Sequence, residues 1–248
     1  MIRNLFGSTR RLLVFAALTI ALPVGAFAQA GRGGQAAPRS ARDAAPIDLT
    51  GYWVSVVTED WRFRMVTPPK GDYASVPLNP AGRKVADAWD PTKEDDACKA
   101  YGAAALMRVP GRVHITWQDD ATMKLDTDAG TQTRLLHFGG ARPQGLKPSL
   151  QGYSRSQWEP AAGGRGGDLK AITTDLQAGS LRKNGVPYSD KTVVTEYMNR
   201  ADESNGESWL IITTIVEDPE YLNQPFITST HFKRQVDASG WNPSPCTR

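Results

Sequence analysis

The chain has 248 residues and an almost even charge balance, with 29 Lys and Arg against 26 Asp and Glu. Three of the bases fall within residues 1–28, which hold no acidic residue, so the rest of the chain carries 26 bases and 26 acids. Nucleic-acid binding needs a clustered basic surface, and this composition argues against it.

Residues 1–28 have the pattern of a secretion signal. Arginines near the N-terminus precede an apolar run from Leu12 to Ala26, and Ala26-Phe27-Ala28 fits the small-x-small cleavage rule. The run is short for a membrane span, so we expect cleavage, no stable membrane anchor afterwards, and a periplasmic or secreted protein. Residues 29–46 are rich in Gly, Ala, Arg and Pro and predict a disordered linker, which leaves residues 47–248 as one domain.

The first part of this domain predicts two strands and two short helices. Residues 52–58 and 61–66 have strand patterns, with Glu59 and Asp60 in the turn between them. Asn79 followed by Pro80 is typical of a helix start and predicts a helix through residue 89. A second short helix is expected around residues 95–104.

From residue 111 onward, strand patterns follow one another with turn residues between them. The predicted strands are 112–118, 122–127, 131–138, 152–159, 169–174, 192–200, 207–216 and 225–235, and residues 182–187 are predicted to form a turn. Nine or ten strands without alternating helices favour a mostly β fold, an antiparallel up-and-down β-barrel with one or two short inserted helices. A β-sandwich is the alternative.

Cys98 and Cys246 are the only cysteines. In an oxidising exported compartment, such a pair is typical of a disulfide. The bond would close a loop of nearly 150 residues and stabilise the fold by roughly 4–5 kcal/mol in the chain-entropy model. Two separate thiols are the alternative.

The stretch Asp48-Leu49-Thr50-Gly51-Tyr52-Trp53 resembles the first-strand Gly-x-Trp signature of the lipocalin/calycin barrels. The resemblance implies that Trp53 closes the base of a lipocalin-like barrel and that a basic residue of the last strand, Lys233 or Arg234, stacks on it. The chain departs from the family in its inserted helices and in lacking a clear C-terminal helix. The region after the signal also resembles a family of exported bacterial proteins, which implies no chemistry.

Strong catalytic signatures are absent from the sequence, whether a Gly-x-Ser-x-Gly elbow, a phosphate-binding loop or a His-Glu-x-x-His motif. Polar residues nevertheless gather on the predicted strands, and inside a barrel they could perform acid–base catalysis without a cofactor. The candidates are His114 or His231 as the base, Glu196 or Asp126 to orient it, and Arg134 or Tyr197 to stabilise an oxyanion. The alternative is that these side chains face water on half-exposed strands.

The predicted ligand-binding residues are Trp61, Arg62, Arg64 and Trp117, since an aromatic-lined barrel cavity suits a small lipophilic or aromatic molecule. The first functional hypothesis is therefore an exported lipocalin-like barrel that binds such a molecule. The alternatives are a cofactor-independent lyase or isomerase and an envelope protein with a filled barrel. No cofactor is expected, and a metal site built from His114, His137 and His231 is disfavoured because the first two lie in opposite registry.

Overall fold

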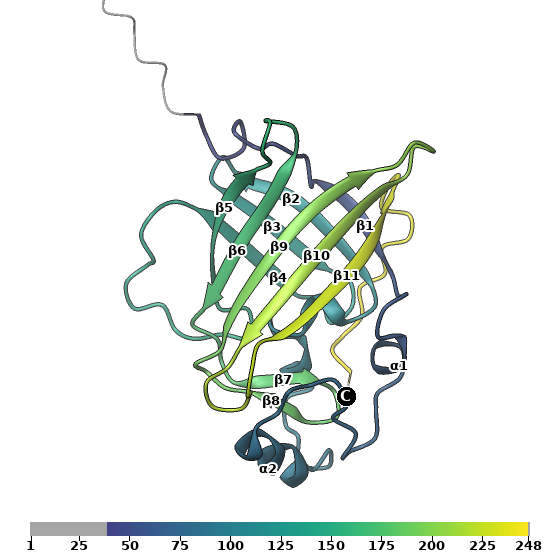
Figure 1. The fold of residues 1–248 in the computed structure, drawn as a ribbon, viewed down its shortest axis with the longest axis vertical. Helices are drawn as coiled ribbons and strands as arrows, with labels where there is room; N and C mark the ends of the chain where they lie inside the picture. The colour runs from purple at the N-terminus through teal and green to yellow at the C-terminus, as the bar shows by residue number, and fades with distance from the viewer. Residues whose placement is uncertain (1–38, 248) are drawn as a thin grey trace, which may run out of the picture. The chain divides into compact units, whose positions relative to one another are not determined.

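Within residues 39–247, which the computed structural model describes, nine strands close into a barrel in the order β1-β11-β10-β9-β6-β5-β4-β3-β2 (Figure 1). This confirms the mostly β, up-and-down barrel. The predicted signal segment and residues 29–38 of the predicted linker lie outside the described residues. The barrel strands are β1 (Gly51–Val56), β2 (Arg112–Asp119), β3 (Thr122–Thr127), β4 (Thr133–Phe138), β5 (Tyr153–Pro160), β6 (Gly167–Thr174), β9 (Val193–Asp202), β10 (Ser208–Glu217) and β11 (Phe226–Gln235).

The barrel contains one parallel pair of neighbours, β4 and β5. Strand directions cannot alternate all the way round a closed ring of nine strands, so one pair must run the same way. The segment of residues 139–152 returns the chain to the end where β4 began, so that β5 can run alongside β4. The other neighbouring pairs in the ring are antiparallel.

The predicted strand over residues 61–66 is wrong. The chain there forms a single helical turn, α1 (Trp61–Arg64). Both edges of β1 are already paired, with β11 and with β2, so a strand directly after β1 has no edge left to join. Asp60 instead reverses the chain with a left-handed φ of 49°, and its carbonyl accepts the N–H of Phe63 at 2.8 Å. An alternation of apolar and polar residues over only six positions does not distinguish a strand from one helical turn.

The inserted elements gather at one end of the barrel (Figure 1). Helix α2 (Pro80–Ala88) confirms the first predicted helix, with Asn79 Oδ1 accepting the N–H of Gly82 at 2.9 Å. The 3₁₀ turn η1 (Lys99–Tyr101) lies within the second predicted helix, and η2 (Leu106–Arg108) follows it. The predicted turn at 182–187 joins a two-stranded hairpin, β7 (Gly179–Arg182) and β8 (Val186–Tyr188). Among residues 39–247, no helix is long and apolar enough to cross a membrane.

Trp53 lies on β1 and is fully buried in an apolar cluster. Its indole Nε1 donates to the carbonyl of Leu49 at 2.9 Å, and the guanidinium of Arg234 lies 5.6 Å from its ring centroid. The resemblance implied this stacking, and the structure assigns it to Arg234, whereas Lys233 lies over Trp209.

Inward-facing side chains pack the barrel in two apolar clusters. One surrounds Trp53 and includes Leu125 and Phe232. The other includes Val216 and Phe226 and lies at the end of the barrel that α2 and the β7–β8 hairpin cover. Close packing of this kind leaves space for ligands mainly outside the barrel wall.

Residues 39–46, predicted as part of the linker, lie against the barrel. The carbonyl of Ala41 accepts the indole N–H of Trp158 at 2.7 Å, and the N–H of Arg42 donates to the carbonyl of Asp120 at 3.2 Å. Trp158 in turn packs against Phe138, with 5.2 Å between ring centroids. This segment therefore covers an aromatic end of the barrel.

Candidate functional site

A pocket of about 360 Å³ lies between the α1 segment, the 3₁₀ turns, β7 and the C-terminal tail. None of its lining residues belongs to a barrel strand, so the pocket is outside the barrel wall. Its volume falls in the usual range for small-molecule sites. The described residues that line it include no Asp or Glu but four cations: Arg64, Arg108, Arg182 and Lys183.

Contacts between distant segments hold the arginines in place. Arg64 Nε donates to the carbonyl of Arg108 at 3.0 Å, and Arg182 Nη1 donates to the carbonyl of Ala74 at 2.8 Å. The guanidinium of Arg182 also stacks on Phe63, 4.2 Å from the ring centroid. The cationic cluster is therefore assembled only when the inserted elements pack on one another.

The three guanidinium groups are incompletely partnered. Arg64 forms an ion pair with Glu59, and Arg108 pairs with Asp60 at 3.0 Å. Each arginine still has one buried nitrogen without a hydrogen-bond partner among residues 39–247, and these atoms are Arg64 Nη2, Arg108 Nη2 and Arg182 Nε. Most buried polar groups in proteins are hydrogen-bonded, so three orphaned donors in one cluster need a physical explanation.

The electrostatics of the pocket favour an anion. Burial, and then the charge of Arg108, lower the pKa of Arg182 to about 10. Burial also lowers the pKa of Arg64; Glu59 opposes this effect and Arg108 adds to it. Both groups remain cationic at neutral pH, but their charged forms are less stable here than in water. A bound anion would stabilise them.

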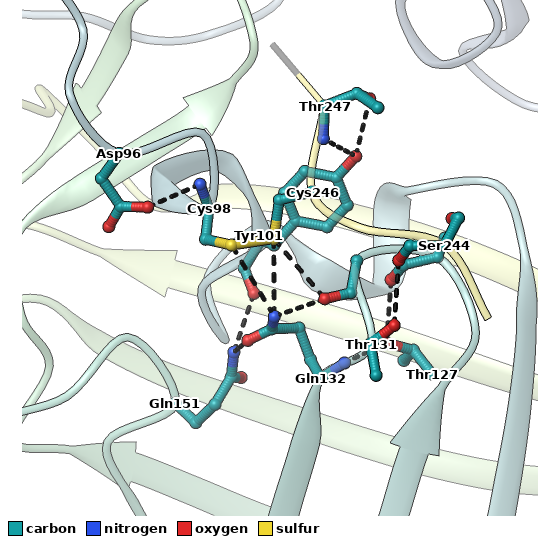
Figure 2. Close-up of a disulfide and its surroundings, with 12 residues drawn as sticks. Asp96, Cys98, Tyr101, Thr127, Thr131, Gln132, Gln151, Ser244, Cys246 and Thr247 are labelled. Atoms are coloured by element: carbon teal, nitrogen blue, oxygen red, sulfur yellow. Dashed lines mark hydrogen bonds between the residues drawn. A yellow bond between two sulfur atoms is a disulfide. The ribbon is translucent and has the colours of Figure 1, made fainter.

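The C-terminal tail forms one wall of the pocket, and the predicted disulfide between Cys98 and Cys246 is present and holds it (Figure 2). The hydroxyl of Tyr101 accepts the N–H of Thr247 at 3.1 Å, and Lys183 Nζ donates to Thr247 Oγ1 at 2.7 Å. Burial raises the pKa of Tyr101, but Lys183 and Thr247 outweigh it, so this pKa lies below its ordinary value. The tail that forms this wall is therefore hydrogen-bonded to Tyr101 and to the cation Lys183.

Of the predicted ligand-binding residues, Arg64 lines this pocket and the other three do not. Trp61 is 64% exposed on α1, and Arg62 extends away to pair with Asp72 at 2.8 Å. Trp117 lies at the far end of β2, with its ring centroid 5.4 Å from that of Phe138. One of the four predicted residues therefore lies at this pocket.

Two predicted catalytic residues, Arg134 and Glu196, meet inside the barrel. Their side chains are fully buried and form two parallel hydrogen bonds of 3.0 and 2.5 Å. Arg134 also donates to Thr173 Oγ1 at 3.2 Å, and the Thr173 hydroxyl lies 2.7 Å from that of Ser154. The pair is therefore enclosed by strand side chains.

The other four candidates lie on the outer face of the barrel. His114 stacks on Tyr52, with 3.9 Å between ring centroids, and is paired across strands with Asp126. Burial lowers the pKa of His114, an effect that Asp126 opposes and Lys124 reinforces. The ring of Tyr197 lies 5.1 Å from Lys170 Nζ, and His231 Nδ1 lies 3.1 Å from Glu59. The six candidates thus divide between the interior and the outer face.

Sequence reasoning missed Tyr101, Arg108, Arg182 and Lys183. These residues come from η1, η2 and the β7–β8 hairpin, and the spacings between them match no ligand-binding motif. The one local signal is the placement of an Arg directly after apolar residues, as in Leu106-Met107-Arg108 and Leu181-Arg182. That signal identifies cations at the edge of a core, but it does not show that they share a pocket.

Comparisons of this chain with protein-family models, with curated proteins and with solved structures found no match. Within residues 39–247, no group of three or more His, Cys, Asp or Glu side chains is arranged to hold a metal ion.

Replacing Arg182 by methionine should leave the Tm of the ligand-free protein unchanged or raise it. A base whose pKa falls on folding opposes folding at every pH below the folded value, which for Arg182 is about 10. At neutral pH the lowered pKa corresponds to on the order of 3 kcal/mol. That offsets the hydrogen bonds to Ala74 and Ser75 that the variant loses. Thermal unfolding followed by circular dichroism measures the change, and a fall in Tm of more than about 4 °C would contradict this expectation.

Proposed function

We propose that this protein binds a small organic anion in the pocket lined by Arg64, Arg108 and Arg182. The observation that carries the proposal is the gathering of three buried guanidinium groups, each with an unpaired nitrogen, around one pocket. The planar fork of arginine matches the geometry of carboxylate and phosphate groups. A ligand with one such group in the pocket would offset the positive charge of the cluster.

The rest of the pocket favours a ligand with an apolar or aromatic body. Phe63, Met65, Tyr101 and Leu181 contribute apolar walls beside the cations. The proposal keeps the small apolar or aromatic guest expected from the sequence, adds an anionic group to it and places it outside the barrel wall. We propose binding rather than lyase or isomerase chemistry because the six candidate catalytic residues divide between the barrel interior and its outer face.

We also propose that the protein is exported and is related to the lipocalin/calycin barrels. A closed barrel with a buried Trp53 and Arg234 stacked on it supports the relationship. The Cys98–Cys246 disulfide supports a periplasmic or secreted location, since such bonds persist in oxidising compartments.

Titration calorimetry with benzoate and phenyl phosphate tests the binding proposal. Both anions should bind, whereas benzyl alcohol and benzylamine, which have similar bodies but no negative charge, should bind at least about tenfold more weakly. The reason is that a hydrogen bond to a charged group contributes roughly 1.5–3 kcal/mol. Arg182→Met should weaken benzoate binding by about tenfold or more for the same reason.

The matched control is Arg155→Met, which removes an exposed arginine from the outer face of β5. This variant should bind benzoate as the wild type does. Equal affinity for benzoate and benzyl alcohol, or an unchanged affinity in Arg182→Met, would refute anion binding at this pocket.

A further inference from the structure

Three large apolar side chains stand exposed next to the arginine pocket. Trp61, Met65 and Val66 are 64%, 59% and 64% exposed, and we call them the α1 patch. Residues four apart share a helix face, so Trp61 and Met65 lie on the same side of this turn. Met65 also lines the pocket, which makes the patch continuous with the cationic site. Figure 1 shows α1 at the periphery, beside the end of the barrel where the inserted elements gather.

Such a cluster needs a physical explanation. Single exposed apolar residues are common on protein surfaces, but contiguous ones mark interaction sites. The α1 patch has charged neighbours of both signs. The side chain of Arg62 is 67% exposed and Lys70 is exposed in the following loop, whereas Glu59 and Asp60 directly precede Trp61 and pair with the pocket arginines. Arg62 also pairs with Asp72, so part of its charge is already neutralised. The cations next to the patch are therefore mainly those that line the arginine pocket.

We propose that the α1 patch docks this protein on an anionic membrane surface, with the phosphate of a phospholipid headgroup in the arginine pocket. This inference rests on the proposed function, because it names a lipid phosphate as the anion that the pocket binds. In a bilayer, the charged phosphates lie immediately above the start of the acyl chains. A cationic pocket that shares a residue with an apolar patch matches that arrangement.

The residue types in the patch suit this environment. Tryptophan is favoured at the membrane–water interface, because its ring is apolar and its N–H stays near water. Basic residues beside an amphipathic segment add attraction to anionic lipids. Because the patch has only three side chains, it is far smaller than the roughly 800 Å² per partner of a standard protein interface. The patch therefore favours a membrane over a second protein chain.

Co-sedimentation with lipid vesicles tests this inference on the purified wild-type protein. Vesicles of phosphatidylcholine mixed with phosphatidylglycerol should bind the protein at least about tenfold more strongly than vesicles of phosphatidylcholine alone. A Trp61→Ser/Val66→Ser double variant should lose about tenfold or more of this binding, because it removes two apolar side chains from the membrane contact. Ile227→Ser is the matched control, since Ile227 is 60% exposed on β11 and its loss should leave vesicle binding unchanged.

Small-anion binding separates failure of this inference from failure of the proposed function. The Trp61→Ser/Val66→Ser variant should bind phenyl phosphate as the wild type does, and Arg182→Met should weaken both phenyl phosphate and vesicle binding. If the wild type binds phenyl phosphate but not the anionic vesicles, membrane docking alone is overturned; if it binds neither, the proposed function fails with it. Docking through the α1 patch would also be overturned if the double variant still bound vesicles. It would likewise be overturned if the wild type were a dimer in solution and the double variant a monomer.

Discussion

Replacing Arg134 by methionine should lower the free energy of unfolding by about 3–5 kcal/mol. The variant keeps most of the side-chain volume but leaves the Glu196 carboxylate in the barrel interior without its cation. Both partners are fully buried in the wild type, and their two parallel hydrogen bonds are the main compensation for burying the charges. Urea denaturation followed by tryptophan fluorescence measures the difference.

The double variant Arg134→Met/Glu196→Leu shows whether the loss comes from an orphaned charge. Apolar side chains of similar volume often replace a buried ion pair at little or no cost. Most of the stability lost in the single variant should therefore return in the double variant. Arg155→Met, on the exposed outer face of β5, should change stability by less than about 0.5 kcal/mol. A similarly small effect of Arg134→Met would mean that the ion pair does not form.

The contrast between Arg134 and Arg182 separates a structural arginine from a binding one. Arg134 is held by a carboxylate in two hydrogen bonds. Arg182 is held by a backbone carbonyl and a serine hydroxyl, and the neighbouring positive charge of Arg108 lowers its pKa further. Removing Arg134 should destabilise the protein, whereas removing Arg182 should relieve an unfavourable charge and weaken anion binding. Arg134→Met should therefore lower the free energy of unfolding, whereas Arg182→Met should lower the affinity for anions.

The strands and the barrel were predictable because the sequence carries their signal locally. Turn residues separate the segments from residue 111 onward, and period-two alternation shows which side chains share a face. The Gly-x-Trp resemblance offered Lys233 or Arg234 as the residue stacked on Trp53, and the structure shows Arg234 there. Alternation could not decide which face points inward, so Arg134 and His114 were weighed together although one is inside the barrel and the other outside.

The pocket was not predictable because its parts meet only through the packing of inserted segments. Arg64 and Arg182 are 118 positions apart in the chain, and both touch residues that belong to other inserted elements. The strand wrongly predicted at 61–66 shows the same limit. Its sequence suits a strand, but the pairing of β1 with β11 removes the edge that the strand would need. Such competition for strand edges is a property of the closed barrel and has no local signature.

A Cys98→Ser/Cys246→Ser variant should lose about 4–5 kcal/mol of stability, because the bond restricts a long loop in the unfolded chain. The two cysteines are 148 positions apart, and the bond ties the C-terminal tail to the segment that enters η1. Urea denaturation under oxidising conditions measures the loss. A reducing agent should lower the stability of the wild type and leave that of the variant unchanged. If the variant and the wild type unfold at the same urea concentration, the bond does not contribute to stability.

The same variant should also weaken anion binding. Ser244 and Thr247 line the pocket on either side of Cys246, and Thr247 contacts both Tyr101 and Lys183 (Figure 2). Without the disulfide, forming these hydrogen bonds requires ordering a free chain end, which costs conformational entropy. The tail should therefore leave the pocket wall more often. The affinity for benzoate should therefore be lower in the variant. The comparison is made without urea, after circular dichroism has shown that the variant is folded. An unchanged affinity would place the anion on the arginine side of the pocket alone, away from the tail.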